Sequence, residues 1–134
     1  MSGVVIDSSA IVALVLAEPT ADEITTHIED ADHRVVSAAT LVELSMVIEA
    51  RRGLAGLTLV ADIVRDSEIE IVEFDEDSAR RAIKAWRRFG RGKHPARLNL
   101  GDCFTYALAD ETGYPVLCTG NDFAQTDLEV LPSR

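Results

Sequence analysis

The sequence predicts one α/β domain built on a mainly parallel sheet of four or five strands. Short apolar runs alternate with longer stretches of helical periodicity along the chain, and strands joined by helical crossovers form parallel sheets with helices on both faces. The chain has 134 residues and is 47% hydrophobic, which is enough for one core and argues against disorder. No repeat or linker divides it, so we expect a single domain over residues 1–134.

The first half of the chain is expected to supply two strands and three helices. They are a strand at Val4–Ile6, helices at Ser9–Leu16 and Ala21–Glu29, a strand at Arg34–Ser37 and a long helix from about Ala38 to Arg52. Pro19 and Thr20 separate the first two helices, because proline cannot continue a helix. Gly53 is expected to stop the long helix.

The second half repeats this alternation. It is expected to contain a helix at Leu57–Asp66, a strand at Ile69–Phe74, a helix at Glu76–Phe89, a loop at Gly90–Leu98, a helix at Leu100–Glu111, a strand at Val116–Cys118 and a possible edge strand at Leu128–Leu131. Asp75 is a suitable N-cap for the helix that follows it. Gly113 and Pro115 end the helix before the fourth strand.

Four carboxylates fall where this fold would bring them together. Asp7 and Asp122 follow strands, while Glu43 and Asp102 lie in early turns of helices. Strand C-termini and helix N-termini share one edge of a parallel sheet, the edge where α/β proteins place their sites. Carboxylates without histidine or thiol partners suit a hard divalent cation bound through oxygen. We therefore predict a metal site that works on phosphates.

Each of the four carboxylates also has a structural explanation. Asp7 could cap the helix after it, and Asp122 could end a turn. Thr40 with Glu43, and Asn99 with Asp102, match the capping-box spacing. Four independent caps on one edge are a weaker explanation than one shared site. Glu43 is the most informative of the four, because apolar residues surround it in the sequence and an unpaired carboxylate there is costly.

Charge and cysteine content narrow the function further. The net charge is −10, yet eight of the thirteen Lys and Arg residues fall between Arg80 and Arg97. This basic stretch could hold phosphates, or it could be a solvated helix face. Cys103 and Cys118 lie in apolar runs and are expected to be small buried residues. No apolar run is long enough to span a membrane, so we expect a cytoplasmic protein.

Four stretches of the sequence carry a family resemblance. They are Val5–Ala10, which contains Asp7; Ala38–Leu44, which contains Glu43; His94–Ala109, which contains Asp102; and Leu117–Leu128, which contains Asp122. Taken together, in order and at this spacing, they resemble the PIN-domain ribonucleases, specifically the VapC toxins of bacterial toxin–antitoxin pairs. The resemblance covers essentially the whole chain.

This resemblance implies a PIN-like three-layer α/β/α sandwich with sheet order 3-2-1-4-5. Asp7 and Asp102 would be the principal ligands of Mg²⁺, for which Mn²⁺ could substitute, and Glu43 and Asp122 would complete the catalytic site. Ser9 would support the site, and Asn121 stands where many relatives have a further aspartate. The implied activity is endoribonuclease, with RNA as substrate. The implied partners are a second copy of the chain and a cognate VapB-like antitoxin.

Two other functions stay open from the sequence alone. One is a PIN-fold RNA-binding module without activity, and the other is a phospho-acceptor regulatory domain, which would require a lysine after a late strand. Among further candidates, His94 could contact RNA beside Lys93. Phe104, Tyr106 and Trp86 are spaced as core residues of helices and are expected to be buried.

Overall fold

The sheet of the protein has five strands, all paired in parallel, in the order β3-β2-β1-β4-β5. The computed structural model describes residues 2–133. Its elements are β1 (Gly3–Ile6), α1 (Ser8–Val15), α2 (Ala21–Asp30), β2 (His33–Ser37), α3 (Ala38–Asp66), β3 (Glu70–Val72), α4 (Glu76–Phe89), α5 (Leu100–Thr112), β4 (Val116–Leu117), the 3₁₀ helix η1 (Phe123–Gln125) and β5 (Val130–Leu131). The predicted α/β fold and strand order are confirmed.

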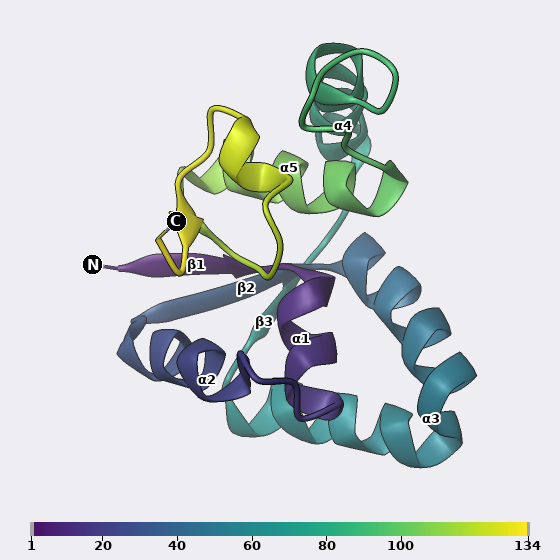
Figure 1. Cartoon of the computed structure of the whole chain (residues 1–134), viewed down its shortest axis with the longest axis vertical. Helices are drawn as coiled ribbons and strands as arrows, with labels where there is room; N and C mark the ends of the chain where they lie inside the picture. The colour runs from purple at the N-terminus through teal and green to yellow at the C-terminus, as the bar shows by residue number, and fades with distance from the viewer. Residues whose placement is uncertain (1, 134) are drawn as a thin grey trace.

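Helices cover both faces of the sheet, as the three-layer prediction requires. In Figure 1, α1, α2 and α3 lie below the sheet, whereas α4, α5 and η1 lie above it. Alternate residues of β1 serve the two layers because successive side chains of a strand point to opposite faces. Val4 and Ile6 pack with the lower helices, and Val5 packs with the upper ones.

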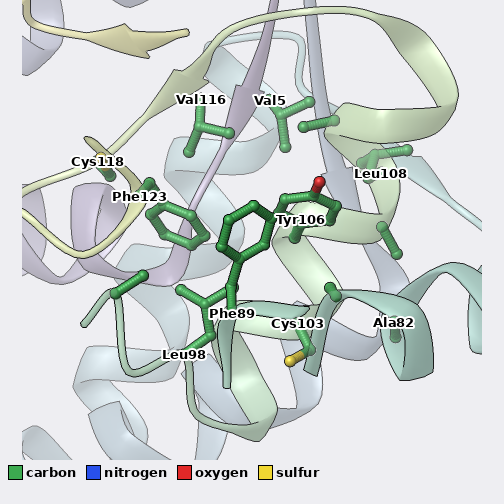
Figure 2. Close-up of a cluster of buried hydrophobic side chains, with 14 of the residues drawn as sticks. Val5, Ala82, Phe89, Leu98, Cys103, Tyr106, Leu108, Val116, Cys118 and Phe123 are labelled. Carbon is green, nitrogen blue, oxygen red and sulfur yellow. The ribbon is translucent and has the colours of Figure 1, made fainter. Parts of the chain in front are cut away.

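The upper core is built around one aromatic side chain. Figure 2 shows Phe89 of α4 between Tyr106 of α5 and Phe123 of η1, beneath Val5 and Val116 of the sheet. The ring centroids of Phe89 and Tyr106 are 5.7 Å apart. This packing joins α4, α5 and η1 into one layer, so the turn that carries η1 has a fixed position over the sheet.

Most of the expected boundaries are confirmed within a residue or two. Gly53 interrupts α3 with a positive φ of 65°, so the two halves of α3 meet at a kink there; the second half begins directly after it, earlier than the predicted Leu57. The predicted cap at Asp75 is present as a capping box with Ser78. The prediction for β3 was too long, because this edge strand pairs only with the end of β2.

Burial of the aromatic residues corrects one prediction. Tyr106 is buried and Phe104 is half-buried, but Trp86 is 47% exposed. On α4 the residues that face the core are Ala82, Ala85 and Phe89, and Trp86 lies on the flank of that face. Its ring instead receives the ammonium of Lys93 at 4.4 Å. Within residues 2–133, no helix combines the length and apolar character needed to cross a membrane.

Candidate functional site

Asp7 is the most enclosed of the four carboxylates. It follows β1 and caps α1 by accepting a hydrogen bond from the backbone N–H of Ser9 at 3.1 Å, so the capping interpretation is correct. Three further facts go beyond a cap. Asp7 is only 4% exposed, the Ser9 hydroxyl donates to its Oδ2 at 2.7 Å, and the Thr105 hydroxyl donates to its Oδ1 at 2.6 Å. Two hydroxyls therefore fix both oxygens of a buried carboxylate.

Asp102 lies in the first turn of α5, where it forms a capping box with Asn99. The Asn99 backbone N–H donates to Asp102 Oδ2 at 3.0 Å, and the Asp102 N–H donates to Asn99 Oδ1 at 2.8 Å. This predicted cap is therefore present. It engages one carboxylate oxygen, and Oδ1 accepts no hydrogen bond from any residue in the range 2–133. The cap thus orients the side chain while leaving one oxygen available.

The side chain of Asp102 lies in a partly buried and negatively charged environment, which raises its pKa. This pKa is raised from its ordinary value of 3.8 to about 6: burial is the largest cause, the Asn99 hydrogen bond lowers it, and the charges of Asp7, Asp122 and Glu43 raise it. Charged groups interact measurably only at short range in this setting. The four predicted carboxylates therefore lie within electrostatic reach of one another at one edge of the sheet.

Glu43 lies in the second turn of α3 and does not cap that helix. The N-cap of α3 is Ser37, whose side chain accepts from the Ala39 N–H at 3.2 Å, so the capping box predicted for Thr40 and Glu43 is wrong. The Glu43 carboxylate instead lies against Gly101 of α5, where any Cβ would collide with it. Burial raises the pKa of Glu43, a hydrogen bond with Ser8 lowers it, and the charge of Asp7 raises it.

Asp122 and Asn121 occupy the exposed turn between β4 and η1. Asp122 precedes η1 without a side-chain capping bond, and its charge acts on Asp102. Asn121 is exposed and has no hydrogen bond to the four carboxylates among the contacts of residues 2–133. The structure thus brings Asp7, Glu43, Asp102 and Asp122 to one edge, and it leaves Asn121 at the rim.

The sequence-based prediction missed three residues near the carboxylates. Thr105 holds Asp7, Ser8 interacts with Glu43, and Gly101 makes room for Glu43. The fixed Ser9 hydroxyl also accepts a hydrogen bond from the Thr119 N–H at 3.0 Å, which ties β4 to the site. The spacing of Thr105 one turn after Asp102 was the available signal, since both face the same side of α5.

The donor set fits a hard divalent cation in its chemistry. All four charged groups are carboxylates, and the nearest thiol, Cys103, stays protonated because burial and Asp102 raise its pKa to about 11. As the side chains stand, no three His, Cys, Asp or Glu residues within 2–133 are arranged to hold a metal ion. Binding would therefore require some of the four to turn towards a shared ion, and the metal role stays a prediction.

The basic stretch between Arg80 and Arg97 lies mainly on α4, above the sheet. Part of it is internally paired: Arg81 contacts Asp77 at 2.8 Å and Asp110 at 2.7 Å, and Arg88 contacts Asp127 at 3.3 Å. His94 has a role inside its loop, where its Nδ1 accepts from the Ala96 N–H at 3.0 Å. Contact of His94 with RNA stays a prediction.

Comparisons with known proteins agree with this fold. The PIN domain family matches residues 4–129. Ribonuclease VapC30 of Mycobacterium tuberculosis is 42% identical over 125 residues, which cover 92% of this chain and 95% of that protein. Ribonuclease VapC of Mycolicibacterium smegmatis is 40% identical over 124 residues, covering 92% of this chain and 96% of the relative.

Solved structures show the same fold at lower identity. The crystal structure of Mycobacterium tuberculosis VapC20, a Sarcin-Ricin loop cleaving toxin, has a TM-score of 0.77 at 14% identity and covers 93% of this chain and 95% of that one. DNA-bound VapBC from Salmonella typhimurium has a TM-score of 0.76 at 17% identity, covering 97% of this chain and 96% of that one. With the family match and the two relatives above, these comparisons lead to one conclusion: the chain belongs to the PIN domain family, within its VapC ribonucleases.

Proposed function

We propose that this protein is an endoribonuclease toxin of a type II toxin–antitoxin pair, hydrolysing RNA phosphodiester bonds with Mg²⁺, for which Mn²⁺ can substitute. The observation that carries the proposal is the group of four carboxylates that act on one another while no Lys or Arg within residues 2–133 forms an ion pair with any of them. A protein retains such uncompensated charge at a cost, and perturbed carboxylates of this kind cluster at functional sites. The ribonuclease relatives support the same activity.

Asp7 and Asp102 are the residues we assign to hold the ion, with Glu43 and Asp122 beside them. A divalent cation bound there would supply an activated water and offset the charge that develops on the phosphate. Repulsion between the carboxylates in the metal-free protein is relieved when the ion enters, so binding is expected to stabilise the fold.

The surrounding residues prepare these ligands. The Ser9 and Thr105 hydroxyls keep Asp7 from rotating, and the Asn99 cap presents Asp102 Oδ1. Such outer partners orient metal ligands and tune their affinity. Glu43, whose pKa burial raises, is the carboxylate we assign to accept the proton that the attacking water releases.

A nuclease assay tests the activity. The protein should cleave RNA in Mg²⁺ or Mn²⁺ and fail to do so in a chelator, and Asp7→Ala should lose cleavage while its far-UV spectrum stays that of the wild type. Cleavage retained in metal-loaded Asp7→Ala would contradict the assignment. A wild type that binds RNA without cleaving it would indicate the inactive binding module instead.

The antitoxin is the partner that we propose for the apolar surface next to Glu43. A groove of about 530 Å³ there is lined by Ala39, Val42, Glu43, Met46, Val47, Leu100, Gly101 and Phe104. Val42, Met46 and Leu100 are 63%, 69% and 73% exposed, which is unusual for such residues. An apolar helix of an antitoxin could cover this surface and direct an Arg towards the carboxylates, as helices in grooves commonly do.

Co-expression with the product of the adjacent upstream gene tests this partnership. We expect the two proteins to purify together and growth to slow when this chain is expressed alone. Met46→Asp should lower the amount of co-purified partner, whereas Leu54→Asp should not, because Leu54 is 74% exposed but lies outside the groove. Absence of a complex together with normal growth would reject the toxin assignment. Light scattering would test whether the free protein is a homodimer and the complex a hetero-oligomer, as we also propose.

A further inference from the structure

The basic face of α4 borders a groove that the proposed chemistry does not use. The groove has a volume of about 400 Å³ and is lined by Arg81, Lys84, Ala85, Arg87, Arg88, Tyr106, Asp110 and Asp127. Its lining residues come from α4, from α5 and, with Asp127, from the segment after η1. We call it the α4–α5 groove. Four of the eight Lys and Arg residues in the basic stretch between Arg80 and Arg97 line it.

The cations of this groove fall into two kinds. Arg81 and Arg88 are held by Asp110 and Asp127, which fixes the walls. Lys84 and Arg87 are exposed on α4 and form no ion pair with any residue in the range 2–133. With four cations against the two lining carboxylates and Asp77, which also pairs with Arg81, the groove keeps a positive excess in a chain whose net charge is −10.

The helix α5 links the groove to the carboxylate site, because it carries Asp102 of the site and Tyr106 and Asp110 of the groove. Asp102, Tyr106 and Asp110 are four residues apart, so they share one face of the helix, and each step advances about 6 Å along its axis. The Tyr106 hydroxyl donates to Asp127 Oδ1 at 2.6 Å, which holds the far end of the turn that begins at Asp122. The groove therefore starts about one helical turn beyond Asp102.

We propose that the α4–α5 groove binds the phosphate backbone of the RNA strand next to the bond that is cleaved. This inference rests on the proposed ribonuclease function. Lys84 and Arg87 supply the charge that phosphates require, and a local positive field suffices for this even on an acidic protein. A single strand can follow a groove of this kind by its backbone, independently of base sequence.

The two flanks of α4 favour RNA over a protein segment in this groove. The exposed apolar residues of α4, Ile83 and Trp86, line a separate groove on the other side of the helix. The α4–α5 groove is lined mainly by charged side chains, and its aromatic residue, Tyr106, is buried. A helical peptide that docks in a groove lays apolar anchors into it, whereas a nucleic-acid strand gains affinity mainly from cations that contact its phosphates.

RNA binding by a charge-matched pair of variants tests the proposal. The groove variant is Lys84→Ala with Arg87→Ala, and the control is Arg51→Ala with Arg52→Ala, which removes two exposed cations from α3 below the sheet. Binding of a fluorescent single-stranded RNA oligomer is measured by anisotropy in a chelator at several salt concentrations. Since each phosphate contact contributes about 0.7 to the log–log salt slope, the groove variant should lose about 1.4 of it, and the control none.

Each other outcome would overturn the groove assignment. Equal losses in both variants would mean that the cations act only as diffuse charge, and no loss in the groove variant would place the phosphates elsewhere. Competition by polyglutamate as strong as that by unlabelled RNA would indicate an acidic protein segment. Circular dichroism checks that both variants fold. Because binding is measured without metal, a failure of RNA cleavage would reject the proposed function separately.

Discussion

Two groups of carboxylates have opposite kinds of partners in this fold. On the α4 side, Asp77, Asp110 and Asp127 each pair with an arginine. At the sheet edge, the charges of Asp7, Glu43 and Asp122 act on Asp102. The partners of Asp7, Glu43 and Asp102 are hydroxyls and backbone N–H groups. The α4-side pairs join helices to each other and to the η1 turn. At the sheet edge, burial and then the neighbouring negative charges raise the pKa values of Asp102 and Glu43, which is a cost that structure alone does not require.

The partner of a carboxylate therefore indicates its role better than the mere presence of the carboxylate in the sequence does. Twenty-three Asp and Glu residues occur in the chain, and acidity by itself singles out none of them. Lack of a cation separates the sheet-edge group from the α4-side group, and burial further marks Asp7, Glu43 and Asp102. Variants of the two groups should therefore differ in catalysis, metal affinity and stability.

The largest effect is expected on catalysis. Asp102→Asn keeps an acceptor for the Asn99 cap but removes the charge, so it should fold and lose RNA cleavage by on the order of 10³-fold or more, since metal assistance contributes several kcal/mol. Glu43→Gln should be similarly damaging, with some change in stability because of its close packing on Gly101. Initial rates at saturating Mg²⁺ check both. A rate within tenfold of the wild type for Asp102→Asn would contradict the contrast.

A smaller effect is expected from Thr105, which touches Asp7 but carries no charge. Thr105→Val keeps the shape and removes the hydroxyl that donates to Asp7 Oδ1, so the apparent Mg²⁺ affinity should fall by about 10–100-fold. Thr105→Ser restores the donor and should restore most of the affinity. A metal titration followed by thermal unfolding measures both variants. Equal affinities for the valine and serine variants would show that the hydroxyl does not position Asp7.

The raised pKa of Asp102 predicts a modest dependence of stability on pH. The folded protein binds this proton more tightly than the unfolded chain does, so the proton's stabilising effect is complete below about pH 4 and is lost as the pH rises through about 6. In a chelator, the wild type should lose stability relative to Asp102→Asn over that interval and stay level above it. With Mg²⁺, affinity should rise over the same interval because the proton competes with the metal. A flat difference between the two melting curves would argue against the raised pKa.

The smallest effect is expected for a paired carboxylate. Asp77 forms an exposed i,i+4 pair with Arg81, and such pairs contribute little. Asp77→Asn should lower the midpoint of thermal unfolding by no more than about 5 °C and leave its Mg²⁺ dependence unchanged. A large loss of metal response in this variant would erase the distinction between the two groups.

The features of the fold and site that could be predicted from the sequence depend on local signals. Asp7 directly after an apolar strand, Asp75 before a helix and Gly53 as a helix stop all act within a few residues, and the structure has each as predicted. The sheet order came from the family resemblance. Glu43 shows how a local rule fails: Thr40 and Ser37 both qualify as caps, and only the folded backbone reveals that α3 starts at the earlier residue.

Contacts between distant parts of the chain could not be predicted from the sequence. Thr105 and Asp7 are 98 positions apart; the spacing of Thr105 after Asp102 indicates its side of α5 but does not identify Asp7 as its partner. Trp86 was expected in the core because helical spacing does not distinguish the middle of a buried face from its flank. The arginines on α4 likewise gave no indication that Asp110 and Asp127 would hold two of them and leave Lys84 and Arg87 exposed.

The most direct test of a metal site at the four sheet-edge carboxylates is the shift in unfolding temperature on adding millimolar Mg²⁺ or Mn²⁺ to three proteins. We expect an upward shift for the wild type, the same shift for Asp77→Asn, and little or none for Asp102→Asn, because only the sheet-edge carboxylates gain from an added cation. Without metal, Asp102→Asn should be at least as stable as the wild type at neutral pH. Equal shifts in the wild type and Asp102→Asn would contradict the claim that these four carboxylates form a metal site.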